Sequence, residues 1–355
     1  MKKMCNVIDF LIKYSCNIKS CDTVYINFFG EENDFLQYLL KRIHEIGAKY
    51  ILKIDSNKEL NNILNNLTIE KVNALAEEEV KRIKQCNVYI SLVADEVKIN
   101  EKLEKEYFIY QNYYKKIVRD TRLKYCRWLG LKLPTNSMAN LVNMKFHEFE
   151  KLFYEACDVD YIELEKQNLK LAHELERTKK IRIIAQNTDF SFTKEGIPSR
   201  ILCGKINLPD GEIYTSPNKY SVNGVIKFNT TCLQAGDKFE NIKLAFKNGK
   251  VIKAECSYNA LKLNNILNSD EGAGYIGEFA IGINEKIRKP IGLILFDEKI
   301  KGSIHIAMGQ SYKDAYNGND SSLHWDMVLD MNKESGGGKI FFDDNLVFED
   351  GEWFV

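Results

Sequence analysis

The sequence predicts an α/β domain at the N-terminus, followed by a β-rich α+β domain at the C-terminus. Its 355 residues suit about two domains. The first half alternates β-rich runs with helical patterns, whereas the chain after residue 181 consists mainly of short β-like runs separated by Gly, Asn and Asp. We expect the boundary between residues 160 and 185, and we set the two domains at 1–170 and 171–355.

A strand, a helix and a second strand open the first domain. Residues 24–29 are β-rich, residues 34–46 carry apolar side chains at helical spacing, and residues 50–54 form the second β-rich run. Gly47 lies where a helix C-terminal glycine belongs. This order and spacing predict a parallel βαβ unit.

The remaining elements follow from the same patterns. Residues 88–93 predict a third strand of the sheet, and residues 57–85, 102–124 and 146–180 are helical in pattern. The second domain contains β-like runs at residues 181–184, 225–228, 243–246, 251–256, 292–296, 304–308 and 340–342.

Composition and charge argue against several classes of protein. Fifty Lys and Arg balance fifty Asp and Glu, which disfavours a nucleic-acid binder that works through bulk positive charge. No apolar run approaches the roughly 20 residues of a membrane-spanning helix, and the N-terminus does not read as a signal peptide. The nine cysteines are dispersed without C-x-x-C spacing, so we expect a reducing cytoplasm and no zinc ribbon.

One glycine motif stands in the wrong context for its usual function. Residues 272–277 match G-x-G-x-x-G, but a polar stretch precedes them and a β-like run follows. A dinucleotide fingerprint lies instead between a strand and a helix, so we interpret this match as chance. The sequence also lacks a P-loop and the G-x-S-x-G motif of serine hydrolases.

Two of the five histidines lie in β-like segments. His324 and Asp326 are two residues apart, and on a strand their side chains project from one face with Cα atoms roughly 6.5–7 Å apart. That spacing suits two ligands of one metal, or one ligand on each of two neighbouring metals. His305 lies in a period-2 pattern, on the face opposite Ile304 and Ile306. Taken singly, a histidine in a strand is more often structural, and H-x-D is a weak motif.

Several acidic residues lie at the ends of β-like segments or within them. Glu212 begins such a run, Glu278 lies in an apolar run, and Asp297 and Glu298 stand where an apolar strand is expected to give way to a turn. An unpaired buried carboxylate is costly, so each acid must be exposed, paired, protonated or bound to a metal. Together with the two histidines, these acids predict a nitrogen- and oxygen-rich site that suits Zn, Mn, Co or Mg.

In their order along the chain, four motifs resemble those of the thermophilic-type metalloaminopeptidases, the aminopeptidase T family of bacteria. The motifs occupy residues 207–217, 270–278, 297–312 and 319–326, and the last ends in H-x-D. The likeness extends upstream to residues 128–139 and 188–190, and it is weaker in the first hundred residues. Any one motif alone would be unspecific, whereas the four in order make the resemblance specific.

The resemblance implies an enzyme that removes N-terminal amino acids from peptides with a pair of divalent metal ions. It also implies the two-domain fold of that family, usually as a homodimer. The implied metal ligands are Glu212, Glu278, His305, His324 and Asp326. Glu298 matches an acidic residue that is either a further ligand or a partner of one, and Tyr312 matches the family's active-site tyrosine.

This comparison suggests a mechanism in which metal-activated water attacks the scissile carbonyl. Tyr312 would donate a hydrogen bond to the developing oxyanion, and Glu278 or Glu298 would act as the general base. Glu278 or Asp326 would suit a position between the two metals. Two spacings depart from the family pattern: the segment 312–324 is shorter, and the segment 298–305 is longer, which leaves the role of Glu298 open.

Two alternatives remain on the sequence alone. A dipeptidase or an amino-acid amidase would use the same metal site with a different pocket. A non-catalytic metal-binding protein would retain the ligands without turnover. The expected partners are peptides with a free N-terminus, and we expect neither nucleic acid nor membrane as a partner.

Overall fold

The computed structural model describes residues 2–234 and 237–355, and the chain forms two compact units. Unit 1 comprises Met1–Asp158 and Gly204–Pro209, and unit 2 comprises Val159–Cys203 and Asp210–Val355. Unit 1 contains a parallel sheet and unit 2 contains antiparallel sheets, which confirms the predicted fold class. The expected domain limit at residue 170 falls within a helix of unit 2, α9 (Tyr161–Arg177).

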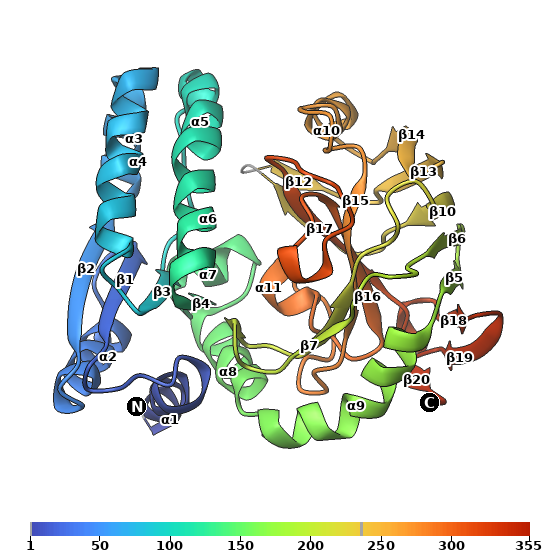
Figure 1. Ribbon diagram of the computed structural model, residues 1–355, viewed down its shortest axis with the longest axis horizontal. Coiled ribbons are helices and arrows are strands. Elements are labelled where there is room, and N and C mark those ends of the chain that lie inside the picture. The colour runs from blue at the N-terminus through green and yellow to red at the C-terminus, as the bar shows by residue number, and fades with distance from the viewer. Residues whose placement is uncertain (1, 235–236) are drawn as a thin grey trace. The chain divides into compact units, whose positions relative to one another are not determined.

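A five-stranded sheet in the order β2-β1-β3-β4-β8 forms the centre of unit 1 (Figure 1). Its strands are β1 (Thr23–Phe29), β2 (Lys49–Asp55), β3 (Val88–Val93), β4 (Arg127–Lys132) and β8 (Asn207–Leu208). Strand β1 pairs in parallel with both β2 and β3, so the predicted βαβ unit and third strand are confirmed. Near-continuous apolar runs suit these strands because helices usually cover both faces of a parallel sheet. Strands β4 and β8 were not predicted from the sequence.

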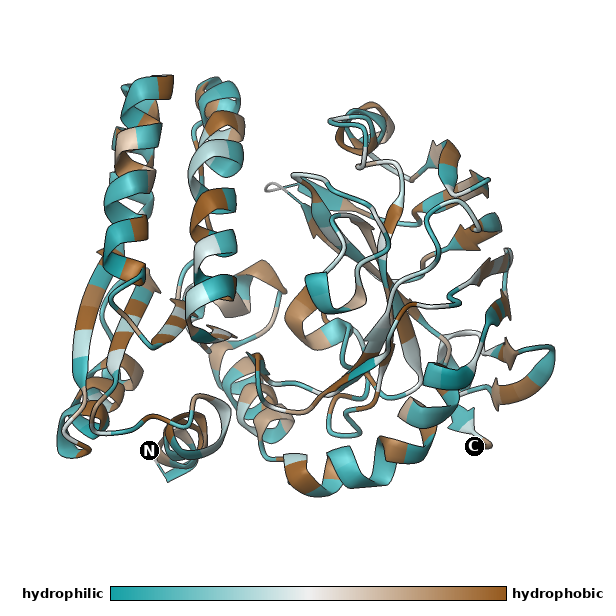
Figure 2. Ribbon diagram, viewed as in Figure 1, coloured by the Kyte–Doolittle hydropathy of each residue, from teal (hydrophilic) through white to brown (hydrophobic). Residues whose placement is uncertain are grey.

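The helices of unit 1 show hydrophobic and hydrophilic patches in turn along their length (Figure 2). Helix α2 has a typical residue at each end. Asn33 caps its first turn by accepting from the Leu36 N–H, and Gly47 follows its last turn at φ +83°. The helices are α1 (Lys2–Phe10), α2 (Asp34–Glu45), α3 (Asn57–Asn65), α4 (Ile69–Ile83), α5 (Glu104–Tyr110), α6 (Lys116–Tyr125), α7 (Asn136–Leu141) and α8 (Phe146–Cys157), with short turns η1 (Leu11–Ser15), η2 (Glu101–Leu103) and η3 (Gln111–Lys115).

In the part of unit 2 that the structure describes, the strands form three antiparallel sheets. The largest has the order β14-β13-β10-β6-β5-β18-β19-β20, a five-stranded sheet has the order β17-β16-β15-β9-β7, and β11 pairs with β12. The strands are β5 (Lys180–Ala185), β6 (Thr188–Thr193), β7 (Arg200–Leu202), β9 (Glu212–Thr215), β10 (Asn223–Lys227), β11 (Cys232–Gln234), β12 (Asp237–Phe239), β13 (Lys243–Lys247), β14 (Lys250–Glu255), β15 (Ile276–Gly282), β16 (Ser303–Gly309), β17 (His324–Asp330), β18 (Gly338–Phe342), β19 (Asn345–Glu349) and β20 (Glu352–Trp353).

One expected strand is a helix. The run at 292–296 was predicted to be β, but the chain forms the short helix α11 (Ile294–Asp297) there. The cause is Asp297, whose carboxylate accepts hydrogen bonds from the Ile291 and Gly292 N–H groups, both at 2.8 Å, and so folds the segment back on itself. The other helical segments of unit 2 are α9, α10 (Ala260–Leu267), η4 (Lys313–Ala315) and η5 (Lys333–Ser335).

In unit 2, the five-stranded sheet β17-β16-β15-β9-β7 has one apolar face, which packs on the eight-stranded sheet. Phe279 of β15 meets Phe192 of β6 with ring centroids 5.1 Å apart. Side chains alternate along a strand, so the neighbours Glu278 and Ala280 lie on the opposite face. Among the described residues, no helix is long and apolar enough to cross a membrane.

Candidate metal centre

Four neighbouring strands of the five-stranded sheet in unit 2 bring Glu212, Glu278, His305, His324 and Asp326 to one face, whereas Glu298 lies just after α11. Directly opposed residues on paired strands project to the same side. On one neighbouring strand each ligand is opposed by a small residue: Gly282 lies opposite Glu212, Ala307 opposite Glu278 and Asp326, Ala280 opposite His305, and Gly309 opposite His324. On their other neighbouring strands, Glu212 and His305 are opposed by Leu202 and Val328. The small side chains leave volume between the longer ones, where a cation can lie.

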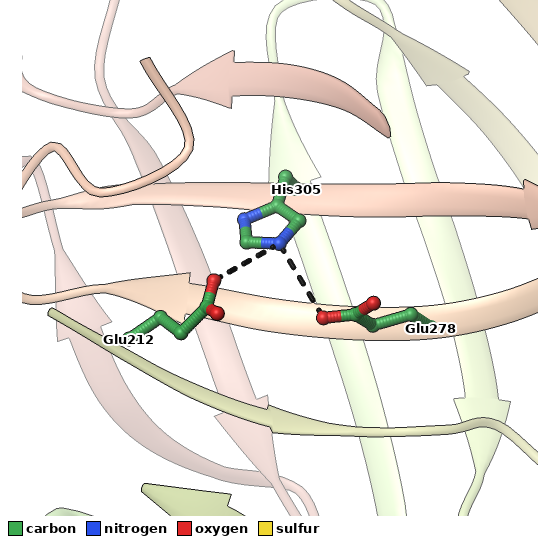
Figure 3. Close-up of side chains that lie close together, drawn as sticks. All are labelled: Glu212, Glu278 and His305. Atoms are coloured by element: carbon green, nitrogen blue, oxygen red, sulfur yellow. Dashed lines mark ion pairs between the residues drawn. The ribbon is translucent and has the colours of Figure 1, made fainter. Parts of the chain in front are cut away.

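A first cluster, which we call the His305 group, consists of Glu212, Glu278 and His305. Figure 3 shows one ring nitrogen of His305 between the two carboxylates. The His305 Nε2 atom lies 3.4 Å from Glu212 Oε2 and 3.6 Å from Glu278 Oε1. All three residues are buried.

A second cluster, the His324 group, consists of Glu278, His324 and Asp326. The His324 Nε2 atom lies 3.4 Å from Glu278 Oε2 and 3.7 Å from Asp326 Oδ1. The other ring nitrogen, Nδ1, is 2.8 Å from the Gln310 carbonyl oxygen, to which it donates. That hydrogen bond orients the ring so that Nε2 faces the carboxylates. Glu278 therefore joins the two groups, with one oxygen toward each histidine.

The donor sets of both groups fit divalent metal ions. Within each group, one ligand atom per residue lies within 4.8 Å of the others, and Glu298, His305 and Asp326 form a third such set. Imidazole nitrogen with carboxylate oxygen is a donor combination that Zn, Mn and Co accept. In addition, His305 Nδ1 is buried without a hydrogen-bond partner among the described residues.

Electrostatics within the cluster are dominated by its carboxylates. Burial alone would lower the pKa of His305 and His324, but the surrounding acids outweigh burial and raise each pKa to about 9. Burial raises the pKa of Glu212 to about 8. Burial would also raise the pKa of Glu278, but hydrogen bonds from both histidines lower it to about 2. The carboxylates thus hold both imidazoles as cations when no metal ion is bound, and a divalent ion would take the place of that positive charge.

Lys299 lies in this region but was not predicted from the sequence. Its side chain is 1% exposed, and its Nζ atom lies 2.7 Å from Glu212 Oε2, 2.9 Å from Glu298 Oε1 and 3.7 Å from Asp210 Oδ1. Burial would lower the pKa of Lys299, but these carboxylates hold it well above its ordinary value. A lysine next to a glutamate resembles a surface ion pair in sequence; the one available signal was its position between the apolar residues Phe296 and Ile300.

Tyr312 lies beside the His324 group. Its ring centroid is 5.0 Å from that of His324 and 5.7 Å from that of Tyr214. Burial raises the pKa of Tyr312 well above its usual value, and the nearby carboxylates of Glu278 and Asp326 raise it further. The phenol therefore keeps its proton and can donate a hydrogen bond.

Asp270 fixes the segment that leads into β17. Its carboxylate accepts from the Ser322 N–H at 2.8 Å and from the Ser321 and Ser322 hydroxyls, and also from the Gly272 and Ala273 N–H groups. The loop 270–273 is thereby tied to the residues just before His324. This role explains Asp270 within the motif at 270–278 without making it a ligand.

The remaining candidates from the sequence have other surroundings. The histidines outside the centre, His44, His147 and His173, are exposed. The G-x-G-x-x-G match follows α10 and leads into β15, so the strand-then-helix context of a dinucleotide site is absent there.

Comparison with known proteins assigns the chain to a family. The model of the thermophilic metalloprotease (M29) family matches residues 1–353. The chain belongs to this family. The resemblance noted in the sequence is thus confirmed.

Two bacterial aminopeptidases are similar to part of the sequence. Aminopeptidase T of Thermus thermophilus is 30% identical over 159 residues, which are 41% of this chain and 37% of that protein. Aminopeptidase 2 of Geobacillus stearothermophilus is 30% identical over 171 residues, 40% of each chain. The matched segments thus span well under half of these relatives.

A solved structure of wild-type AmpT from Thermus thermophilus has a TM-score of 0.84 and 18% identity, and the match covers 100% of this chain and 99% of that chain. At this identity, the comparison establishes the shared fold alone.

Proposed function

We propose that this protein is a metal-dependent aminopeptidase that releases N-terminal amino acids from peptides. The observation that carries the proposal is the junction of the His305 and His324 groups through Glu278 on a buried sheet face. Family membership supports the reaction class, and relatives in the family carry the name aminopeptidase.

The residues that would hold two divalent ions are those of the two groups. Glu212 and His305 would hold one ion, His324 and Asp326 the other, and Glu278 would contact both. Bound divalent ions supply Lewis-acid polarisation of a carbonyl oxygen and a lowered pKa for water. The identity of the ion follows from availability among Zn, Co, Mn and Mg.

The chain's own side chains supply the proton transfers and the positioning. Glu298 is our candidate for the base that takes the proton of the attacking water and passes it to the leaving amine. Glu298 contacts Lys299 through its Oε1 atom, whereas both oxygens of Glu278 face histidines. Tyr312 would donate to the oxyanion of the tetrahedral intermediate. The carboxylates around the centre would hold the substrate's free α-ammonium, which confines cleavage to N-termini.

Two further properties complete the proposal. All nine cysteines are free thiols, which supports a reducing cytoplasm as the compartment. We also propose a homodimer, in line with the family resemblance, and sedimentation velocity of the purified protein tests it.

A peptide assay tests the reaction class. Protein stripped with a chelator would receive Co, Zn, Mn or Mg in separate samples, and a matched pair of peptides with free or acetylated N-termini would be followed by mass spectrometry. We expect stepwise loss of N-terminal residues from the free peptide alone, abolished by chelation and restored by an ion. Cleavage of dipeptides only would favour a dipeptidase, hydrolysis of amino-acid amides only an amidase, and absence of turnover a non-catalytic role.

A further inference from the structure

The His305 group shares one of its carboxylates with a lysine. Lys299 Nζ is 2.7 Å from Glu212 Oε2, and the same oxygen is 3.4 Å from His305 Nε2. Lys299 is 1% exposed, so its ammonium is shielded from water and depends on carboxylates for neutralisation. A divalent ion that binds Glu212 therefore competes with a cation that is already part of the chain.

The His324 group is free of such a competitor. Among the described residues, the ion pairs of Glu278 and Asp326 are formed with His305 and His324 only, and no Lys or Arg lies within 4.0 Å of these two acids. In the described part of the chain, an ion that enters this group therefore meets no lysine ammonium or arginine guanidinium that already occupies its carboxylates.

The two histidines also differ in how firmly they are oriented. His324 Nδ1 is held by the Gln310 carbonyl at 2.8 Å, whereas His305 Nδ1 is buried without a hydrogen-bond partner among the residues described. A hydrogen bond to the second ring nitrogen fixes the ligand's orientation and raises its affinity for metal. This difference is independent of Lys299 and favours the same group.

We infer that the two ion positions are unequal and fill in sequence. The His324 group binds the first ion tightly, and the His305 group binds the second ion more weakly because Lys299 competes for Glu212. This inference rests on the proposed two-ion centre and adds to it a role for a residue outside the ligand set. Lys299 is a positioning residue that sets the affinity of the second ion.

Lys299 also has a way to stay neutralised when the second ion binds. Its ammonium contacts Glu298 at 2.9 Å and Asp210 at 3.7 Å in addition to Glu212. When an ion takes the Glu212 carboxylate, these two acids remain as its partners. The second position can therefore be filled without leaving an unpaired buried charge, and its occupancy follows the free concentration of divalent ion.

Metal titration of the chelator-stripped protein tests the inference. We would add Mn²⁺ in calorimetric titrations and record the electron paramagnetic resonance spectrum at each step. The wild-type protein should show two binding steps separated by about tenfold or more in Kd. Below one equivalent, the spectrum should be that of isolated Mn²⁺, with spin coupling only as the second equivalent binds. Coupled pairs from the first additions, or two equal steps, would overturn the inference.

Variants assign the steps to the groups. Lys299→Met should tighten the weak step by about tenfold or more and leave the tight step unchanged, whereas Lys299→Arg should retain the separation. His324→Ala should remove the tight step. Lys301→Met is the matched control, because Lys301 is 47% exposed and pairs with Glu285, so both steps should stay as in the wild type.

The outcomes separate this inference from the proposed function. Two equal steps in an enzyme that still removes N-terminal residues would contradict the inference alone. A weak step that is unchanged in a folded Lys299→Met variant would also contradict it. Failure of the wild-type protein to bind divalent ions at all would overturn the proposed function, and the inference with it.

Discussion

The central sheets of the two units both contain buried strands, but they bury different kinds of side chain. In unit 1, β3 places Val88, Ile90 and Leu92 in an apolar core. In unit 2, β15 and β16 are buried along their whole length, yet they carry Glu278 and His305. The first sheet follows the ordinary rule that burial selects apolar residues, and the second departs from it on one face only.

The difference shows where the chain gives up stability for function. Full burial of one aliphatic side chain stabilises a fold by about 1.5–3 kcal/mol, whereas a buried charge without a partner costs several kcal/mol. The cost of burying charges on the metal-centre face of the five-stranded sheet in unit 2 is limited because the acidic and basic groups there neutralise one another. Changes on that face should therefore affect metal and activity, and changes in β3 should affect stability alone.

The largest effect is expected for Glu278→Gln. This substitution keeps the shape of the side chain but removes the charge that both groups share, so both ions should be lost and kcat/KM should fall by about 10³-fold or more. Metal content by mass spectrometry and peptide kinetics provide the measurement. Glu285→Gln, at an exposed position, is the control and should change neither. Retention of two ions in Glu278→Gln would refute the shared role.

A pair of core truncations compares the two sheets directly. Ile90→Ala in β3 and Ile306→Ala in β16 each remove a buried aliphatic side chain, and each should lower the free energy of unfolding by about 3 kcal/mol. Only Ile306→Ala should also weaken metal binding, because its neighbour His305 is a proposed ligand. Denaturant titration and metal analysis test this, and equal metal loss in both variants would contradict the separation of the two regions.

Tyr312→Phe isolates the donor beside the His324 group. Loss of the hydroxyl should reduce kcat by about 10²-fold with metal content unchanged, as expected for removal of one oxyanion donor. The matched control is Tyr316→Phe, which removes an exposed hydroxyl that donates to Asp320 at 2.6 Å. An unaltered kcat in Tyr312→Phe would exclude the proposed role of this residue.

The smallest effect is expected for Asp270→Asn, which weakens the tie between the loop 270–273 and the start of β17. Although burial opposes the shift, hydrogen bonds from Ser322, Ser321 and Ala273 lower the pKa of Asp270 below 3.8. The ionised form is thus favoured by folding, so its contribution is present above pH 3.8 and is lost as the pH falls through the lowered pKa.

For Asp270→Asn we expect a loss of about 2 kcal/mol near neutral pH, and this difference from the wild type should disappear in acid. Thermal unfolding at a series of pH values measures it. Asp344→Asn, which breaks an exposed ion pair with Lys180, should have little effect at any pH. A difference for Asp270→Asn that persists below the lowered pKa would show that the lost charge is not its cause.

The local pattern of apolar and polar residues predicted strands and the sheet faces on which their side chains lie. The apolar run 88–93 coincides with β3, and the period-2 pattern around His305 placed this residue opposite Ile304 and Ile306, as the pairing of Phe279 with Ile306 confirms. The i and i+2 spacing of His324 and Asp326 likewise lies on a strand, β17. These features are visible in sequence because the strand repeat is two residues.

The parts that local pattern missed depend on contacts between distant segments. The run 292–296 is apolar like a strand, but hydrogen bonds from its N-terminal N–H groups to Asp297 make it α11. Lys299 resembled a surface residue because its partners Glu212 and Asp210 are far away in the chain. No spacing rule relates these residues, so only the fold shows that the lysine belongs to the centre.

The most direct test of the central claim is a crystal structure of the Mn²⁺-loaded protein with anomalous scattering data. We expect two anomalous peaks, one among Glu212, Glu278 and His305 and the other among Glu278, His324 and Asp326. The peak in the His324 group should persist at the lowest Mn²⁺ concentration. Ion positions that do not contact Glu278, or a centre without an ion at saturating Mn²⁺, would contradict the assignment of this sheet face as the metal centre.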